Sequence, residues 1–225
     1  MPTEKAERSP LAKSVIDRVG LKSLNAFVTK DHRLVMYPCR NGKLLNFVAM
    51  CPEGDEKVVE SSWLNSGSKD DLMKEFEGYS PELREICSLA EDVKLWSLAS
   101  RDPPRIFHKG KLCLIGDAAH PTLPHQGQGG AQAFEDAATL GALFTADTKS
   151  EGIEEKLRIY NDIRYKQAVT VLFMSRVGDE HREQVMGELH KFLPEVDMPE
   201  NMWHFAWNSY PVKSAQKALS SIAVN

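Results

Sequence analysis

Hydrophobic residues gather in short runs along the first part of the chain and recur at helical spacing along the second. The runs Arg33–Cys39 and Leu44–Met50 are rich in branched and aromatic residues, which favour β-strands. Asn41 and Gly42 lie between them, and this pair favours the positive φ angles of a hairpin turn. The pattern therefore predicts an antiparallel hairpin over residues 33–51.

Two further runs are predicted to be strands. Val93–Leu98 has a strand-like composition. Lys111–Ile115 is a short apolar run that ends at Gly116, which is typical of a strand buried on both faces.

Helical patterns cover much of the remaining chain. Leu11–Leu24 predicts a weak helix that Gly20 interrupts, and Ser68 is a typical N-cap for a helix over 69–77 that ends at Gly78. Further helices are expected over Ser80–Leu89, Gly130–Phe144 and 151–176, and as shorter segments over 181–223 between Pro194, Pro199 and Pro211.

The order of these elements predicts an α+β fold. We expect a sheet with a hairpin backed by helices, and then a helical C-terminal region. In chain order the predicted parts are an irregular or linker segment (1–30), a sheet-containing region (31–100), a part with a glycine-rich motif (101–177) and a helical tail (178–225).

The composition is that of an ordinary globular protein, with 42% hydrophobic and 27% charged residues among 225. Lys and Arg number 28 against 32 Asp and Glu, a formal net charge of −4. A mildly acidic chain without a basic block gives no electrostatic reason to expect nucleic acid or an anionic membrane as a partner.

The cysteines and the N-terminus bear on the predicted cellular location of the chain. Cys39, Cys51, Cys87 and Cys113 form no C-x-x-C pair, which favours reduced thiols in an intracellular, cytoplasmic protein. The polar N-terminus has no apolar signal region, and no apolar run approaches the ~20 residues of a membrane span.

The stretch from Gly116 to Asp136 carries the candidate chemistry. Asp117 follows the predicted strand end, where a carboxylate can accept hydrogen bonds from ligand hydroxyls. Closely spaced glycines let the backbone approach a ligand. The helix that begins near Gly130 offers free N–H groups and a partial positive charge, which suit an anionic or strongly accepting ligand edge.

This stretch resembles the second flavin motif of the class A flavoprotein monooxygenases, in their salicylate hydroxylase branch. The residues that carry the resemblance are Gly116-Asp117-Ala118-Ala119-His120-Pro121, Pro124, Gly127-Gln128-Gly129 and Glu135-Asp136-Ala137. Further similarities over residues 31–177 are Tyr37-Pro38, Leu45-Asn46-Phe47-Val48, Trp63, Phe76, Trp96, Arg101-Asp102-Pro103-Pro104, Gly110-Lys111 and Arg164.

The resemblance implies a partial FAD/NAD(P)-binding α/β fold, in which residues 31–100 lie on the substrate side and residues 101–177 form the C-terminal portion of the FAD-binding domain with its Gly-Asp motif. It also implies FAD as cofactor, NADH or NADPH as co-substrate, and hydroxylation of an aromatic or polyketide-like small molecule with O₂. Asp117 would bond the ribityl chain, and Pro124 and the 127–130 loop would pass beside the isoalloxazine ring. The helix start would face the pyrimidine edge, which becomes anionic on reduction. The implied cofactor-binding residues are Gly116, Asp117, Pro124, Gly127, Gln128, Gly129, Gly130 and Ala131; no catalytic residue is assigned.

The sequence also departs from the family pattern. It contains no Gly-x-Gly-x-x-Gly turn, the fingerprint of a nucleotide-binding βαβ unit, and no middle Asp-Gly motif. We therefore expect the N-terminal Rossmann βαβ unit to be missing and the ADP half of FAD to have no site. Two alternatives stay open: an inactive fragment that acts as a binding module, and a truncated sequence whose other half lies elsewhere.

Polar residues within the motif have competing interpretations. His108, His120 and His125 lack a carboxylate or cysteine at metal-ligand spacing, so no metal site is expected. His120 and His125 are either acid–base groups or polar loop residues near the flavin. Glu135 and Asp136 are expected to be structural and to face a neighbouring loop or solvent.

The aromatic residues have two interpretations as well. Tyr37, Trp63, Phe76 and Trp96 either line a substrate pocket or pack in the core, and core packing is the default. The helix over 151–176 is expected to dock through Tyr160, Arg164, Leu172 and Phe173.

Overall fold

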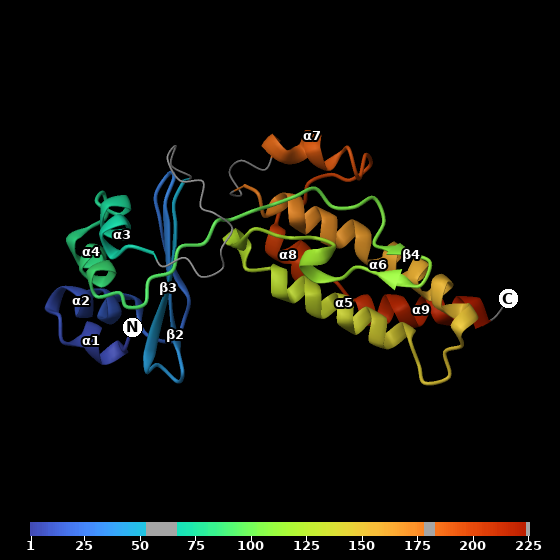
Figure 1. The fold of residues 1–225 in the computed structure, drawn as a ribbon, viewed down its shortest axis with the longest axis horizontal. Helices are drawn as coiled ribbons and strands as arrows, with labels where there is room; N and C mark the ends of the chain where they lie inside the picture. Colours follow the sequence, from blue (N-terminus) through green and yellow to red (C-terminus); the bar gives the residue numbers. More distant parts are fainter. Residues whose placement is uncertain (53–66, 178–182, 224–225) are drawn as a thin grey trace. The chain divides into compact units, whose positions relative to one another are not determined.

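The computed structural model describes residues 1–52, 67–177 and 183–223 (Figure 1). The chain divides into two compact units, Met1–Ser97 and Leu98–Asn225. We describe each unit by itself. Trp63 lies outside the described residues, so its predicted place in a pocket or core stays a prediction.

The first unit is built on a three-stranded antiparallel sheet in the order β1-β2-β3, with β1 at Asn25–Val28. The predicted hairpin is confirmed, since β2 is Arg33–Cys39 and β3 is Leu44–Met50. Its connection is a four-residue loop rather than a two-residue turn, because Cys39 pairs with Leu44. Asn41 and Gly42 have φ angles of 57° and 78°, as the pair predicts, and Arg40 joins them at 49°.

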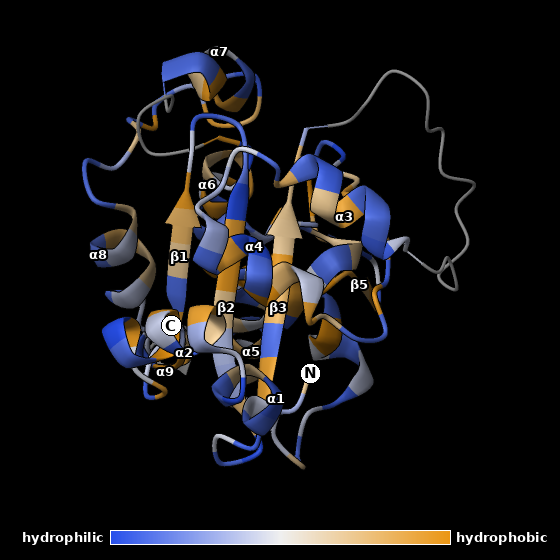
Figure 2. Ribbon diagram, turned by 90° about the vertical axis from the view of Figure 1, so that its left-hand side faces the viewer, coloured by the Kyte–Doolittle hydropathy of each residue, from blue (hydrophilic) through white to orange (hydrophobic). Residues whose placement is uncertain are grey.

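Helices cover one side of this sheet, as Figure 1 shows for α1 (Thr3–Glu7), α2 (Pro10–Val19), α3 (Lys69–Glu75) and α4 (Pro81–Ser88). Residues 1–30, expected to be irregular, therefore carry two helices and a strand. Gly20 ends α2 with φ at 77°, and the Ser68 hydroxyl caps α3 by accepting from the Asp71 amide at 3.2 Å. Figure 2 shows apolar stretches along the strands and hydrophilic residues dominating α3 and α4.

The core of the first unit is almost wholly apolar. Leu34, Met36 and Leu45 of the sheet are buried against Ile86 of α4 and Phe76 beside α3. Phe76 is thus a core residue, as expected by default. Burial raises the pKa of the Cys87 thiol to about 11, which leaves it protonated and inert at neutral pH.

The second unit is helical. Its helices are α5 (Gly129–Leu143), α6 (Ile153–Met174), α7 (Met186–Leu189), α8 (Met202–Trp207) and α9 (Pro211–Ala223), and α5, α6 and α9 contact one another. Apolar side chains such as Phe107, Leu143 and Phe173 fill its core. Within the described ranges, no helix is both long and apolar enough to cross a membrane.

Two predicted strands are wrong. Lys111–Ile115 forms only a two-residue strand, β5 (Leu112–Cys113), paired with β4 (His108–Lys109), and Leu112 and Ile115 are 62% and 43% exposed. Val93–Leu98 has no strand beyond one bridge residue, and Trp96 is 55% exposed rather than core. An apolar run indicates a preference for burial, but burial requires neighbouring strands. Among the described residues, Lys111–Ile115 pairs only with the short β4, and Val93–Leu98 contributes a single bridge residue.

Candidate functional site

The glycine-rich motif folds as two 3₁₀ turns followed by α5. The turns are Gly116–Ala118 and Pro124–Gln126. Gly116 and Gly127 have φ angles of 55° and 62°, which explains why glycine stands at both positions. The turns therefore depend on the glycines that the sequence singles out.

The predicted site residues fall into two groups. Asp117, Pro124, Gly127, Gly130 and Ala131 are exposed and Gly129 is half-buried, whereas Gly116 and Gln128 are buried. The exposed group is free to meet a ligand, and the buried pair lies beneath it.

Asp117 and two glycines of the motif differ in what surrounds them. Among the described residues, the Asp117 carboxylate makes no hydrogen bond. A Cβ added at Gly130 would meet nothing within 4 Å, whereas one at Gly129 would lie 2.8 Å from the Thr122 hydroxyl. Gly130 thus faces open space, and Gly129 is held close to its own neighbouring loop.

The start of α5 is uncapped. Gln128 precedes the helix, and its side chain makes no capping hydrogen bond to the first turn; no other side chain among the described residues does so either. The N–H groups of the first turn have no acceptor within the helix, and the aligned peptides place partial positive charge there. The exposed first turn therefore offers several donors to a ligand.

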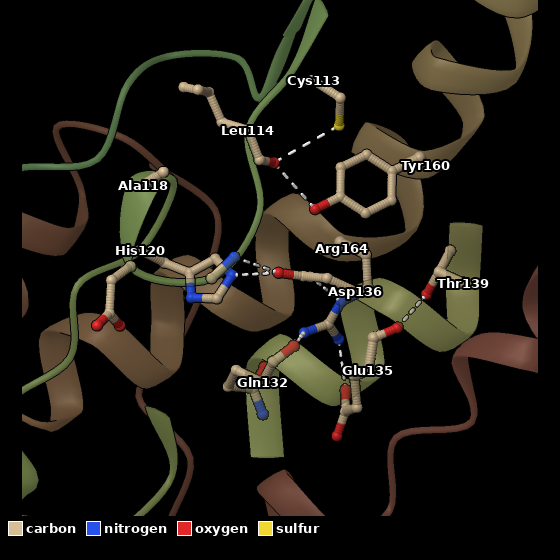
Figure 3. Close-up of polar contacts among 12 residues, drawn as sticks. Cys113, Leu114, Ala118, His120, Gln132, Glu135, Asp136, Thr139, Tyr160 and Arg164 are labelled. Atoms are coloured by element: carbon tan, nitrogen blue, oxygen red, sulfur yellow. Dashed lines mark hydrogen bonds and ion pairs between the residues drawn. The ribbon is translucent and has the colours of Figure 1, made fainter. Parts of the chain in front are cut away.

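A buried carboxylate lies beneath the motif (Figure 3). One oxygen of Asp136 accepts from the Gly116 amide at 2.9 Å and contacts the Nε2 atom of His120 at 2.6 Å. The other oxygen accepts from Nε of Arg164 at 2.8 Å. His120, Asp136 and Arg164 are all 0% exposed, so this cluster is sealed from water.

The Arg164 guanidinium spreads over four contacts. Besides Asp136 it bonds the Glu135 carboxylate, and it donates to the side-chain and backbone oxygens of Gln132 at 2.8 and 3.2 Å. Glu135 also accepts from the Ser209 hydroxyl at 2.9 Å. Arg164 thus joins α6 to three successive polar positions of α5.

Hydrogen bonds keep the buried carboxylate ionised. Burial raises the pKa of Asp136, but the bonds from His120, the Gly116 amide and Arg164 outweigh burial and lower it overall. Nearby, Tyr160 donates to the Leu114 carbonyl at 3.2 Å, and burial together with the Asp136 charge raises the pKa of that phenol. Burial and Asp136 also raise the pKa of Cys113 to about 11.

The buried cluster was only partly predicted. Glu135 and Asp136 are structural as expected, but Asp136 faces the core rather than a loop or solvent, and His120 is a core residue rather than a polar loop residue. The available signal was the helical spacing of Gln132, Asp136 and Thr139, which places polar residues on the same face as buried Leu143. Within the described ranges, no group of His, Cys, Asp and Glu could hold a metal ion.

A family model described as an FAD binding domain matches residues 11–174. The chain belongs to this FAD-binding family. Among its relatives is the FAD-dependent monooxygenase cfoG of Aspergillus candidus, 33% identical over 190 residues that cover 84% of this chain and 44% of that protein. The salicylate hydroxylase of Pseudomonas putida is 32% identical over 175 residues, covering 73% of this chain and 40% of that protein.

A solved structure agrees with this assignment. The salicylate hydroxylase substrate complex matches with a TM-score of 0.75 and 25% identity, over 96% of this chain and 54% of that one. The resemblance to salicylate hydroxylase-like flavoprotein monooxygenases is therefore confirmed, and FAD is the cofactor of the family. The chain spans less than half the length of the curated relatives it matches here.

Proposed function

We propose that this chain provides the isoalloxazine side of the flavin site in an FAD-dependent monooxygenase that hydroxylates an aromatic or polyketide-like small molecule with NADH or NADPH and O₂. The observation that supports this most is the exposed start of α5, without a side-chain cap, next to the Asp117 carboxylate, which has no hydrogen-bond partner within the described part of the chain, in a chain of the FAD-binding family. FAD would supply the redox chemistry that activates oxygen.

The donor and acceptor chemistry of the motif fits one end of FAD. The Asp117 carboxylate would accept from a ribityl hydroxyl, and the first-turn N–H groups at Gly130 and Ala131 would donate to the oxygens of the pyrimidine edge. Pro124 and Gly127 would lie beside the ring, where the lack of a side chain at Gly127 permits close approach. The positive end of α5 would favour the reduced, anionic flavin.

We infer that these residues serve the ribityl and isoalloxazine portion alone. The printed sequence has no Gly-x-Gly-x-x-Gly turn for the pyrophosphate and adenosine. A nucleotide-binding segment, for which the longer relatives have room, would complete that half of the site. The 225-residue chain should then bind riboflavin, FMN and FAD with similar, weak affinities, because the adenosine adds no contact.

A flavin titration of the 225-residue chain tests the proposal. Asp117→Ala should weaken riboflavin binding about ten- to one-hundred-fold, because a charged hydrogen bond contributes ~1.5–3 kcal/mol. Gly130→Val should also weaken it, because the side chain would fill the space that the ring needs. Gly141→Val is the matched control, since Gly141 lies in the same helix with open space around its Cβ position. Equal affinities for Asp117→Ala, Gly130→Val and the unchanged chain would contradict the proposal.

A second candidate function is a binding module without turnover. It is favoured by apolar side chains left exposed around the motif, including Leu112, Ile115 and Phe134, the last 79% exposed. Such a chain would hold a flavin or a partner without redox chemistry. Flavin binding with no oxidation of NADH or NADPH in the presence of an aromatic acid, measured on a protein that also carries the nucleotide-binding segment, would favour this candidate over the monooxygenase.

A further inference from the structure

Both ends of the turn that carries Asp117 are tied to one oxygen atom. The Gly116 amide and the His120 ring reach the same Asp136 oxygen, at 2.9 and 2.6 Å. Within the turn, the Gly116 carbonyl accepts from the amides of Ala119 and His120, both at 2.8 Å. Asp117 is thus held at the exposed middle of a loop whose two ends meet at Asp136.

Arg164 fixes the Asp136 carboxylate in place from its other oxygen. Its Nε atom holds the second Asp136 oxygen at 2.8 Å, and its other nitrogens are occupied by Glu135 and Gln132. A planar guanidinium with several donors in a rigid arrangement restricts a carboxylate more than a single ammonium could. Because Arg164 is on α6, the orientation of Asp136 is set by a second helix as well as by its own.

We propose that Asp136 and Arg164 are positioning residues for the flavin, which close the Gly116–His120 turn and thereby fix where Asp117 presents its carboxylate. The inference rests on the proposed function, because it assigns Asp117 a ribityl hydroxyl as its partner. Neither Asp136 nor Arg164 touches the flavin in this assignment, since both are sealed in the core.

The carboxylate of Asp136 has no adequate replacement at this position. It accepts from three donors, the Gly116 amide, His120 and Arg164. In Asp136→Asn one oxygen becomes an amide donor, which must face at least one of those donors. The Gly116–His120 turn should then lose one of the hydrogen bonds that hold it, even if α5 stays folded in the same position.

Amide hydrogen exchange on the full 225-residue chain tests the closure without any ligand. In Asp136→Asn, the peptide covering residues 114–123 should exchange about tenfold faster or more, since exchange reports local opening. Val171→Ala is the matched control: it removes buried volume from α6 at a site packed on Met174 and Met202, and it takes part in none of the contacts of Asp136. It should lower the melting temperature without speeding exchange of the 114–123 peptide. Unchanged exchange in Asp136→Asn would overturn the inference.

A double variant separates positioning from general stability. Asp136→Leu with Arg164→Met removes both buried charges, a replacement that often restores or raises stability. We expect a melting temperature near that of the unchanged chain, fast exchange over residues 114–123, and riboflavin binding at least about tenfold weaker, like that of Asp117→Ala. Riboflavin affinity that recovers together with the melting temperature would reduce the pair to a structural role and overturn the inference.

The two proposals fail in different ways. If the unchanged chain binds no riboflavin, FMN or FAD, the proposed function fails, and the exchange experiment still decides whether Asp136 closes the turn. If the unchanged chain binds riboflavin and the double variant binds it equally well with a fast-exchanging turn, the positioning role fails and the proposed function stands.

Discussion

The two units of the chain bury different kinds of residue. In the first, Thr3 is the only buried polar residue among those described, and the ion pairs, such as Lys13 with Asp17, lie on the surface. In the second, His120, Gln132, Asp136 and Arg164 share one buried cluster. Apolar burial stabilises without specifying a geometry to fractions of an ångström, whereas a buried ionic cluster fixes donors and acceptors. The contrast agrees with the proposal that the second unit positions the flavin.

The largest expected effect comes from breaking the buried cluster. Arg164→Met leaves the Asp136 charge uncompensated, and such losses cost about 3–5 kcal/mol. Denaturant unfolding followed by hydrogen exchange should show the second unit destabilised by that amount. Amides of β2 in the first unit should keep their protection. An equal loss of stability in both units would contradict the view that the buried ionic cluster supports the second unit alone.

Acid should partly reproduce that effect. Because the pKa of Asp136 is lowered in the folded chain, its contribution to stability is complete above its ordinary value of 3.8 and is lost as the pH falls below that value through the folded pKa. Stability of the second unit, measured by exchange or urea unfolding, should therefore decline below about pH 4 more steeply in the unchanged chain than in Asp136→Asn. Parallel declines would contradict an ionised, paired Asp136.

A smaller effect is expected at the hairpin loop. Asn41 has φ at 57°, and a β-branched residue is disfavoured there by roughly 1–2 kcal/mol. Asn41→Val should speed amide exchange in β2 and β3 and leave α5 and α6 unchanged. A control, Lys43→Val, lies in the same loop with φ outside the positive range and should have little effect.

A single methyl group in the first core should matter less. Ile86 is fully buried against Met36 and Leu45, and Ile86→Val should cost about 1 kcal/mol by loss of packing. Urea unfolding of the first unit measures this. A loss of unfolding free energy as large as that of Arg164→Met would mean that the apolar core of the first unit is as sensitive to substitution as the buried ionic cluster of the second.

The smallest effect is expected on the surface. Lys13 Nζ lies 2.7 Å from an Asp17 oxygen, with both side chains about half exposed. Lys13→Ala should change the stability of the first unit by at most about 0.5 kcal/mol, and less in high salt. Thermal melts at low and high salt measure the difference, and a larger, salt-independent loss would contradict a screened surface pair.

The sequence predicts local structure well wherever neighbouring residues suffice. The strands Arg33–Cys39 and Leu44–Met50 match in both bounds, and the Ser68 cap and the Gly20 stop act on residues within one turn. The strand predicted over Lys111–Ile115 is wrong because burial of a strand depends on partners far along the chain. The strand predicted over Val93–Leu98 is wrong for the same reason.

The candidate site shows a similar division. The roles predicted for the glycines and for the exposed Asp117 rest on the chemistry of turns and helix starts, which involves only a few neighbouring residues. The contacts of Asp136 with His120 and Arg164 span 16 and 28 positions, and no periodicity in the sequence pairs them. The family resemblance indicated that Arg164 belongs to the pattern, but only the fold gives it a role.

The distance along the chain between Asp136 and Arg164 has a consequence for biosynthesis. Asp136 emerges from the ribosome 28 residues ahead of the arginine that holds it. At roughly 5–20 residues per second, that delay is on the order of a few seconds. During this interval the Asp117 turn lacks its proposed closure, even when α5 has already formed. On the proposed function, flavin capture by these residues would therefore follow the translation of α6.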